Sequence, residues 1–195
     1  MHDHIGSQLT FITSSVDILN YLCGNSDNKV LDRLTQIGDF TSSTIVELRD
    51  TIWAMNNNDF TFEDLHRQLL KFIDKAKLAN DDIVFNFSID DKLKSVHFSS
   101  LAGMNMYRTI QEAVNNALKY SDGREISVNI LDRDNKIHIS IRDNGKGFDM
   151  KTVSIGNGLH NMRKRIEDIE GEYTIVSELN KGTAISVVLL KNALK

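Results

Sequence analysis

The sequence contains no proline and only one cysteine among its 195 residues. Because no proline interrupts backbone hydrogen bonding, long unbroken helices are permitted. The single cysteine, Cys23, excludes an internal disulfide framework and a cysteine-rich zinc site, and it fits a reducing compartment. Long apolar runs and a signal-peptide pattern are also missing. We therefore expect a cytoplasmic stretch of protein that makes no direct contact with a membrane.

A strong excess of one charge is lacking as well. The 27 acidic and 23 basic residues leave a formal net charge of −4, and no lysine- or arginine-rich run is present. This balance does not favour binding to nucleic acid. With 26% charged and 41% hydrophobic residues, the composition is that of a globular protein, long enough for one large domain or two small ones.

The first third of the chain carries two periodic segments. Apolar residues recur at alternating intervals of four and three, as in a helix that packs along one seam: Ile5, Leu9, Ile12, Val16 and Leu19. The turn-forming run 23–28 ends this pattern, and a second periodic segment extends from Val30 to Met55. An antiparallel hairpin is predicted, and we expect a homodimer that closes a four-helix bundle. Pairing with the rest of the same chain is the alternative.

A polar run at 56–59 reads as a linker, and we place the domains at 1–57 and 58–195. The second domain is predicted to begin with a helix capped by Thr61 with Asp64. The patterns after it predict these elements in order: a strand at 83–87, a helix at 107–123, strands at 126–130 and 137–141, a helix at 160–169, and strands at 173–176 and 184–190. The predicted fold class is α+β, with a helical hairpin followed by an α/β sandwich whose helices cover one sheet face.

The predicted helix at 107–123 has one polar face. At about 100° per residue, Glu112, Asn116 and Lys119 fall within one narrow arc, opposite an apolar side. The simpler interpretation is a solvated face. However, the adjacent Asn115 and Asn116 are poor helix formers, each costing roughly 0.5 kcal/mol relative to alanine, so another role is indicated.

Two glycine-rich turns follow this helix. Gly145 and Gly147 come after a strand that ends in Asp143, and Gly156 and Gly158 open a helix. Such glycines let the backbone approach a ligand, and a helix N-terminus favours phosphate. The Asp143 carboxylate is suited to accept a hydrogen bond from an exocyclic amine. Each turn alone could be only a tight turn, but together they predict a nucleotide ligand.

These segments resemble the Bergerat-type ATP-binding domain of the histidine kinases, a fold shared with gyrase, the heat-shock chaperone and mismatch-repair ATPases. QEAVNNALKY resembles the family's N box, DNGKGF and GNGLHNMRKRI its two glycine boxes, and Gly182–Thr183 its final G-T pair. The resemblance implies ATP and Mg²⁺ as cofactors, with Asn116 as the metal ligand and Glu112 acting near the γ-phosphate. It also implies these nucleotide-binding residues: Asn116, Lys119, Tyr120, Asp143, Gly145, Gly147, Gly156, Gly158, Leu159 and Thr183.

The first ten residues, MHDHIGSQLT, resemble the phosphoacceptor box of histidine kinases related to the nitrate sensors. The resemblance implies that His2 is phosphorylated and that Asp3 orients its ring or accepts its proton. A neutral imidazole is a competent nucleophile near pH 7. His4 is the rival acceptor, and a surface histidine without function is the simpler alternative. The segment TIWAMNNND also resembles the end of the family's second bundle helix, anchored by Trp53.

The predicted function is therefore the catalytic core of a sensor histidine kinase, which autophosphorylates on His2 and passes the phosphoryl group to an aspartate of a response-regulator receiver domain. Ser7 stands where these relatives often have a glutamine for dephosphorylation, so kinase activity is better supported than phosphatase activity. We expect a sensor and a membrane anchor outside this stretch. The alternatives are an anti-sigma-factor-like serine kinase, another ATPase of this fold, or a degenerate module that binds nucleotide and dimerises.

Overall fold

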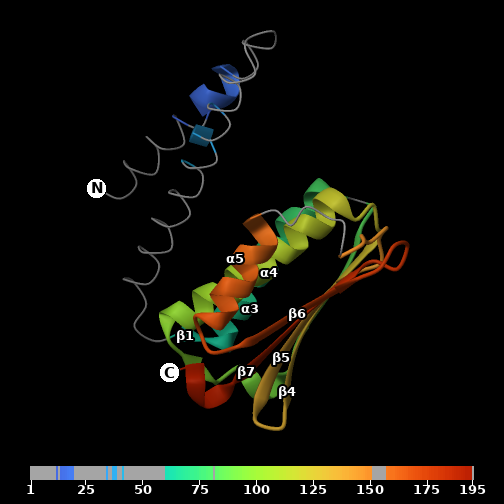
Figure 1. Ribbon diagram of the computed structural model, residues 1–195. Helices are drawn as coiled ribbons and strands as arrows, with labels where there is room; N and C mark the ends of the chain where they lie inside the picture. Colours follow the sequence, from blue (N-terminus) through green and yellow to red (C-terminus); the bar gives the residue numbers. More distant parts are fainter. Residues whose placement is uncertain are drawn as a thin grey trace. The chain divides into compact units, whose positions relative to one another are not determined.

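In the computed structural model the chain divides into two compact units, Met1–Asn57 and Asn58–Lys195 (Figure 1). The structure describes residues 12, 14–19, 34, 37–38, 41, 60–80, 82–150 and 157–194. Among these residues, no helix combines the length and the apolar character that crossing a bilayer requires.

The described residues of the first unit are helical in both periodic segments, as predicted. Val16 is 6% exposed, and a Cβ added to Gly38 would lie 3.4 Å from its Cγ1, so the two segments pack side by side at this level. Ile12, Leu19 and Ile37 are each more than 40% exposed. Other seam positions, including Ile5 and Leu9, lie outside the described residues, and the four-helix bundle stays a prediction.

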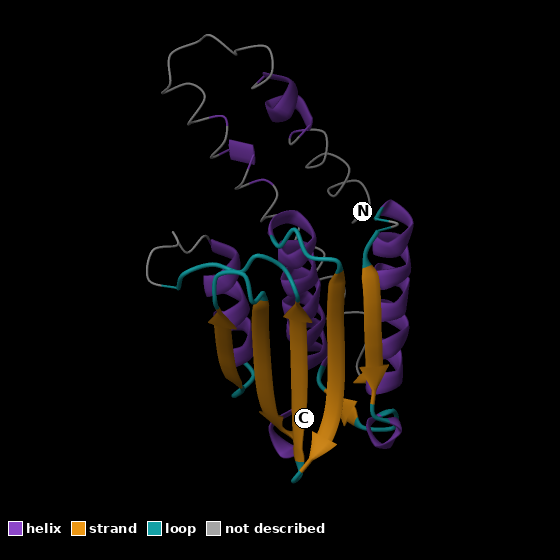
Figure 2. Ribbon diagram, turned by 90° about the vertical axis from the view of Figure 1, so that its right-hand side faces the viewer, coloured by secondary structure: helices purple, strands orange, loops and turns teal. Residues whose placement is uncertain are grey.

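The second unit is built on a five-stranded sheet with the strand order β2-β4-β5-β7-β6. Its strands are β2 (Val84–Ile89), β4 (Glu125–Arg133), β5 (Lys136–Asp143), β6 (Glu172–Ser177) and β7 (Thr183–Leu190). β2 runs parallel to β4, and the other neighbours are antiparallel. Three helices, α3 (Phe62–Ala79), α4 (Ser100–Tyr120) and α5 (Asn157–Glu167), cover one face (Figure 2). The predicted α/β sandwich is confirmed.

Strict alternation along the strands explains why only one sheet face is covered. β4 and β5 bury every second residue, and these residues face each other in register, with Val128 opposite Ile141 and Ile130 opposite Ile139. A shift by one residue would turn this apolar set into solvent, so the pattern fixes the register. The helices then bury their apolar stripes against this layer.

The structure changes the predicted limits of two helices. α4 begins at Ser100, where the Ser99 hydroxyl accepts from the Ala102 amide, and not at Tyr107. Gly103 lies within it, and an added Cβ would stand 2.5 Å from the Phe98 ring, so glycine allows the short β1–β3 sheet (Phe60–Thr61, His97–Phe98) to pack closely. α5 begins at Asn157 and not at 160. Two 3-10 turns, Asp91–Leu93 and Lys191–Leu194, complete the unit.

The start of α3 generates a stability prediction. The Asp64 amide donates to the Thr61 hydroxyl at 3.2 Å, and the Asp64 carboxylate accepts from the Thr61 amide at 3.2 Å and from its hydroxyl at 2.7 Å. Replacing an N-cap threonine by alanine costs about 1 kcal/mol, so we expect Thr61→Ala to lower the free energy of unfolding by that amount near neutral pH. Urea unfolding followed by circular dichroism measures this change.

The same cap predicts a pH dependence. The hydrogen bond from Thr61 lowers the pKa of Asp64 below 3.8, so its stabilisation is present above pH 3.8 and is lost as the pH falls through the lower folded value. The cost of Thr61→Ala should therefore shrink in acid. Thr174→Ala, at an exposed position of β6, is the control and should change stability by no more than about 0.5 kcal/mol. An equal cost of Thr61→Ala at all pH values would contradict this account of the cap.

Candidate functional site

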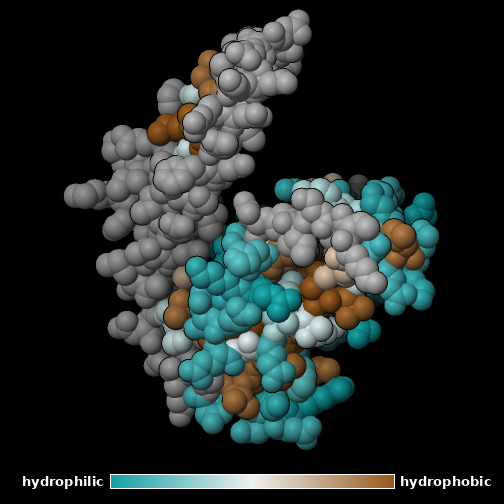
Figure 3. Space-filling view, in the orientation of Figure 1, coloured by the Kyte–Doolittle hydropathy of each residue, from teal (hydrophilic) through white to brown (hydrophobic). Residues whose placement is uncertain are grey.

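A cavity of about 470 Å³ lies between α4, α5 and one end of the sheet. This volume falls within the range of small-molecule sites. Figure 3 shows hydrophobic surface in the space between the helices and the sheet. The cavity is lined by residues from α4, the ends of β5 and β6, the loop after β5, and the starts of α5 and β7: Glu112, Ala113, Asn116, Ala117, Tyr120, Ser121, Ile141, Arg142, Asp143, Gly147, Phe148, Gly158, Leu159, Ile175, Thr183 and Ile185.

One polar part of the wall comes from α4, at the point where the start of α5 approaches it. Glu112 and Asn116, one turn apart on α4, both line the cavity. An added Cβ at Gly158 would stand 2.5 Å from Glu112 Oε1 and 3.7 Å from Asn116 Nδ2. The absence of a side chain at Gly158 therefore lets the α5 backbone approach both polar groups.

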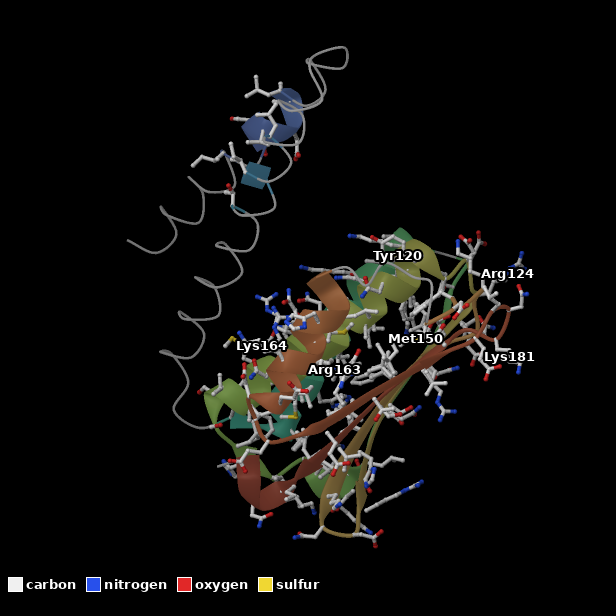
Figure 4. All side chains as sticks on the ribbon, in the orientation of Figure 1. Tyr120, Arg124, Met150, Arg163, Lys164 and Lys181 are labelled. Atoms are coloured by element: carbon white, nitrogen blue, oxygen red, sulfur yellow. The ribbon has the colours of Figure 1, made fainter. Side chains whose placement is uncertain are left out.

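The two remaining predicted residues of α4 differ in position. Tyr120 lines the cavity although it is 64% exposed, which places it at the rim, and Figure 4 shows it at the end of α4. Lys119 is exposed and is not among the lining residues. Asn115 is half-buried and also does not line the cavity. The structure thus brings Glu112, Asn116 and Tyr120 together, and it leaves Lys119 outside.

The floor of the cavity is the sheet. Ile141, Ile175 and Ile185 come from three neighbouring strands and give an apolar surface suited to a flat ring. Asp143 ends β5 beside this floor, and its Oδ1 accepts from the Gly145 amide at 2.9 Å. This bond holds the carboxylate in place and leaves Oδ2 as an acceptor for a ligand.

The glycines of the first turn are required by packing as well as by access. Gly147 has a φ of 56°, and an added Cβ would stand 2.0 Å from the Glu178 carbonyl oxygen. At Gly145, an added Cβ would stand 2.2 Å from the Ser121 carbonyl oxygen, and Gly145 does not line the cavity. Gly145 therefore joins the loop to the end of α4, a role that the sequence did not reveal.

Asn144, which lies between Asp143 and Gly145 in the sequence, also connects the loop after β5 to the chain near α4. Its Oδ1 accepts from the amides of Arg124 and Glu125 at 2.9 and 3.0 Å. The Lys146 amide donates to the Ser121 carbonyl at 2.7 Å. The loop after β5 is thereby fixed to the chain between α4 and β4, and Asp143 keeps its place beside the floor.

Sequence reasoning missed several further residues. The alternation along the strands could have predicted the apolar floor, because its three isoleucines lie on the same sheet face as the buried residues of their strands. Ser177 accepts a hydrogen bond from the Phe148 amide at 2.9 Å in the loop beside the cavity. Nothing in the sequence indicated this, because one serine near a strand end has no distinctive pattern. The predicted His2, Asp3 and Gly156 lie outside the described residues, and Leu159 and Thr183 line the cavity.

The polar groups present fit a magnesium ion that is held only partly by protein. In the part of the chain that the structure describes, no group of three or more His, Cys, Asp or Glu side chains could hold a metal by itself. Mg²⁺ accepts one or two protein oxygen ligands when phosphate and water supply the others. The amide oxygen of Asn116 and the carboxylate of Glu112, both lining the cavity, are suitable groups.

Known proteins similar to this chain include sensor histidine kinases. The chain is 23% identical over 188 residues to the sensor histidine kinase LiaS of Bacillus subtilis (strain 168), covering 96% of this chain and 51% of LiaS. It is 34% identical over 113 residues to the sensor protein VraS of Staphylococcus aureus (strain COL), covering 54% of this chain and 33% of VraS. The chain thus spans about half the length of LiaS and a third of VraS.

Solved structures show the same fold. The histidine kinase domain of the Erythrobacter litoralis EL346 blue-light activated histidine kinase gives a TM-score of 0.63 at 13% identity, covering 99% of this chain and 97% of that one. The Acinetobacter baumannii histidine kinase AdeS gives 0.60 at 15% identity, covering 94% and 95%.

Two family models match separate parts of the chain. Residues 1–59 match the family described as histidine kinase. Residues 103–193 match the histidine kinase-, DNA gyrase B-, and HSP90-like ATPases, and this stretch contains every lining residue of the cavity. Together the two matches cover most of the sequence, and the chain belongs to the histidine kinase family.

Proposed function

We propose that this chain is the catalytic core of a two-component sensor kinase, which transfers the γ-phosphoryl group of ATP to His2 and then to an aspartate of a response regulator. The observation that carries the proposal is that the polar face of α4, the end of β5 and the start of α5 line the same cavity. This arrangement has an apolar floor for a base and polar groups with a helix N-terminus for phosphates.

The base would lie over the isoleucine floor. Asp143 is held by the Gly145 amide, and its second oxygen is available to accept from an exocyclic amine of the base. Tyr120 at the rim would pack against the nucleotide, and Thr183 lies beside Asp143 on the neighbouring strand. These residues would bind and orient the nucleotide.

The phosphates would lie near the start of α5. Because Gly158 has no side chain, no side-chain atom of it stands between the α5 backbone and the groups of Glu112 and Asn116. The backbone amides at the start of α5 could therefore face a phosphate group there. Mg²⁺, held by Asn116, would supply charge neutralisation at the phosphates. Glu112 would orient the incoming imidazole or accept its proton. Lys119, which lies outside the cavity, would contact phosphate only through its long side chain.

His2 is the proposed acceptor, and Asp3 would orient its ring or accept a proton from it. A phosphoryl group moves between donor and acceptor with little covalent help, so positioning decides the rate. The relative DegS carries the name histidine-protein kinase/phosphatase. For this chain we propose kinase activity, because Ser7 lacks the amide that would position a water molecule. The site of action is proposed to be cytoplasmic, with any membrane anchor elsewhere in the whole protein.

Incubation with γ-labelled ATP and Mg²⁺ tests the activity. Wild-type protein should acquire acid-labile label, and His2→Gln should abolish it because the nucleophile is gone. His4→Gln should retain label. Label that survives the loss of His2 but disappears with His4 would transfer the acceptor role to His4.

The same assay tests the proposed metal ligand. Asn116→Ala should reduce labelling by at least about a hundredfold, since a lost ligand weakens both metal binding and positioning. Asn115→Ala is the matched control, because it removes the same amide from the adjacent half-buried position that does not line the cavity. Its labelling should stay within about threefold of wild type. Equal effects of the two variants would refute the metal role of Asn116.

A dimer is proposed from the first unit. Ile12, Leu19 and Ile37 leave apolar surface exposed on a single chain, and a second copy would cover the seam positions. Leu19→Asp should shift the sedimentation coefficient from dimer to monomer in analytical ultracentrifugation. Ile18→Asp is the control, since Ile18 is 59% exposed and lies about 100° away from Leu19 on the helix, off the seam. Dissociation by Ile18→Asp but not by Leu19→Asp would contradict this interface.

A further inference from the structure

Three polar side chains stand in one row across the cavity end of the sheet. Ser177 on β6 is paired with Thr183 on β7. Asp143 on β5 comes directly after Arg142, which is paired with Ala184, so Asp143 stands opposite Thr183. Because side chains alternate along strands, all three share the sheet face that carries the isoleucine floor. Asp143 and Thr183 line the cavity, whereas Ser177 lies behind Thr183 and is only 7% exposed.

The hydrogen bonds of Ser177 determine where its proton is. The Phe148 amide donates to Ser177 Oγ at 2.9 Å, and Ser177 Oγ donates to the Gly182 carbonyl at 3.1 Å. The Ser177 and Thr183 hydroxyl oxygens are 3.0 Å apart. A serine hydroxyl has one proton and two lone pairs. The distance alone allows either hydroxyl to donate in the third bond. With the Ser177 proton on the buried Gly182 carbonyl, the donor is Thr183.

We propose that Ser177 is a positioning residue that fixes the Thr183 hydroxyl as a hydrogen-bond acceptor toward the cavity and thereby selects a base with an exocyclic amine over one with a carbonyl there. With its proton turned toward Ser177, Thr183 presents only lone pairs to a ligand. The Asp143 carboxylate beside it has only acceptor oxygens. This inference rests on the proposed nucleotide-binding function.

The arrangement disfavours a base with a carbonyl at this place, because the acceptor oxygens of Asp143 and Thr183 would then have no donor. An amino group can donate to both acceptors, whereas a carbonyl oxygen in the same place would face two sets of lone pairs. Sites built to hydrogen-bond a substrate group reject an analogue without it far more strongly than apolar pockets reject a missing methylene. Without Ser177, the Thr183 hydroxyl can rotate and donate to a carbonyl. The selection against that carbonyl should then weaken.

Calorimetric titration of the whole chain with ATP and with inosine triphosphate, which has a carbonyl in place of the exocyclic amine, tests this inference. Wild-type protein should bind ATP more tightly. Ser177→Ala should lower the ratio of the two affinities by about tenfold, the effect of one net hydrogen bond. Thr183→Val should lower it too. The double variant should match Thr183→Val, because Ser177 acts through Thr183.

The test uses the ratio of the two dissociation constants, so it stays valid for a destabilised variant. Partial unfolding lowers the apparent affinities for both nucleotides by the same factor. Ser140→Ala, on the uncovered face of β5, is the control and should leave the ratio unchanged. An unchanged ratio in Ser177→Ala, or a further fall in the double variant below Thr183→Val, would overturn the inference while ATP binding still supports the proposed function. Wild-type protein that binds no ATP would overturn both.

Discussion

The site depends on three very close backbone contacts at one end of the sheet. They join the exit of α4 to the loop after β5, that loop to the turn between β6 and β7, and that turn to the end of β5. A Cβ at any of the three glycines involved would stand 2.0 to 2.2 Å from a carbonyl oxygen: Gly145, Gly147 and Gly182. No side chain can occupy that space, and Gly147 and Gly182 also have positive φ. At these three contacts, the spacing between α4, the loop and the strand ends therefore leaves no room for a side chain.

The magnitudes of the remaining interactions show which of them hold these loops. The ion pair between Lys146 and Asp122 is short, at 2.6 Å, but its side chains are 58% and 74% exposed. Such a surface pair contributes at most about 1 kcal/mol, and salt weakens it. The Phe148 amide that donates to Ser177 is partly buried, and leaving such a donor without a partner costs about 1–3 kcal/mol where water is excluded. The two bonds to Asn144 are exposed, so water can replace them at little cost. The hydrogen bond to Ser177 therefore outweighs the ion pair between Lys146 and Asp122.

The sequence predicted what repeats and missed what occurs once. The alternation along the strands and the polar arc of α4 each extend over many residues. The hairpin of β4 and β5, and the position of Glu112 and Asn116 on one face of α4, could therefore be anticipated. The start of α4 was missed because Gly103 weakens the helical pattern and is explained only by the aromatic rings it meets. Ser177 was missed for a similar reason, since the amide that donates to it belongs to Phe148, 29 positions away. Parallel pairing of β2 with β4 also left no local trace.

Under the proposed function, the nucleotide site of the second unit serves an acceptor, His2, that lies more than a hundred positions earlier in the chain. Every described residue that lines the cavity belongs to the second unit, Asn58–Lys195. Phosphoryl transfer demands close alignment at one step, whereas release of the phosphorylated side chain to another protein demands separation at the next. A permanent interface would favour one step and block the other. Under the proposed function, a donor site in the second unit, joined to the unit of His2 through the polar run Asn56–Asp59, would meet both demands, because only the placement of one unit relative to the other would have to change.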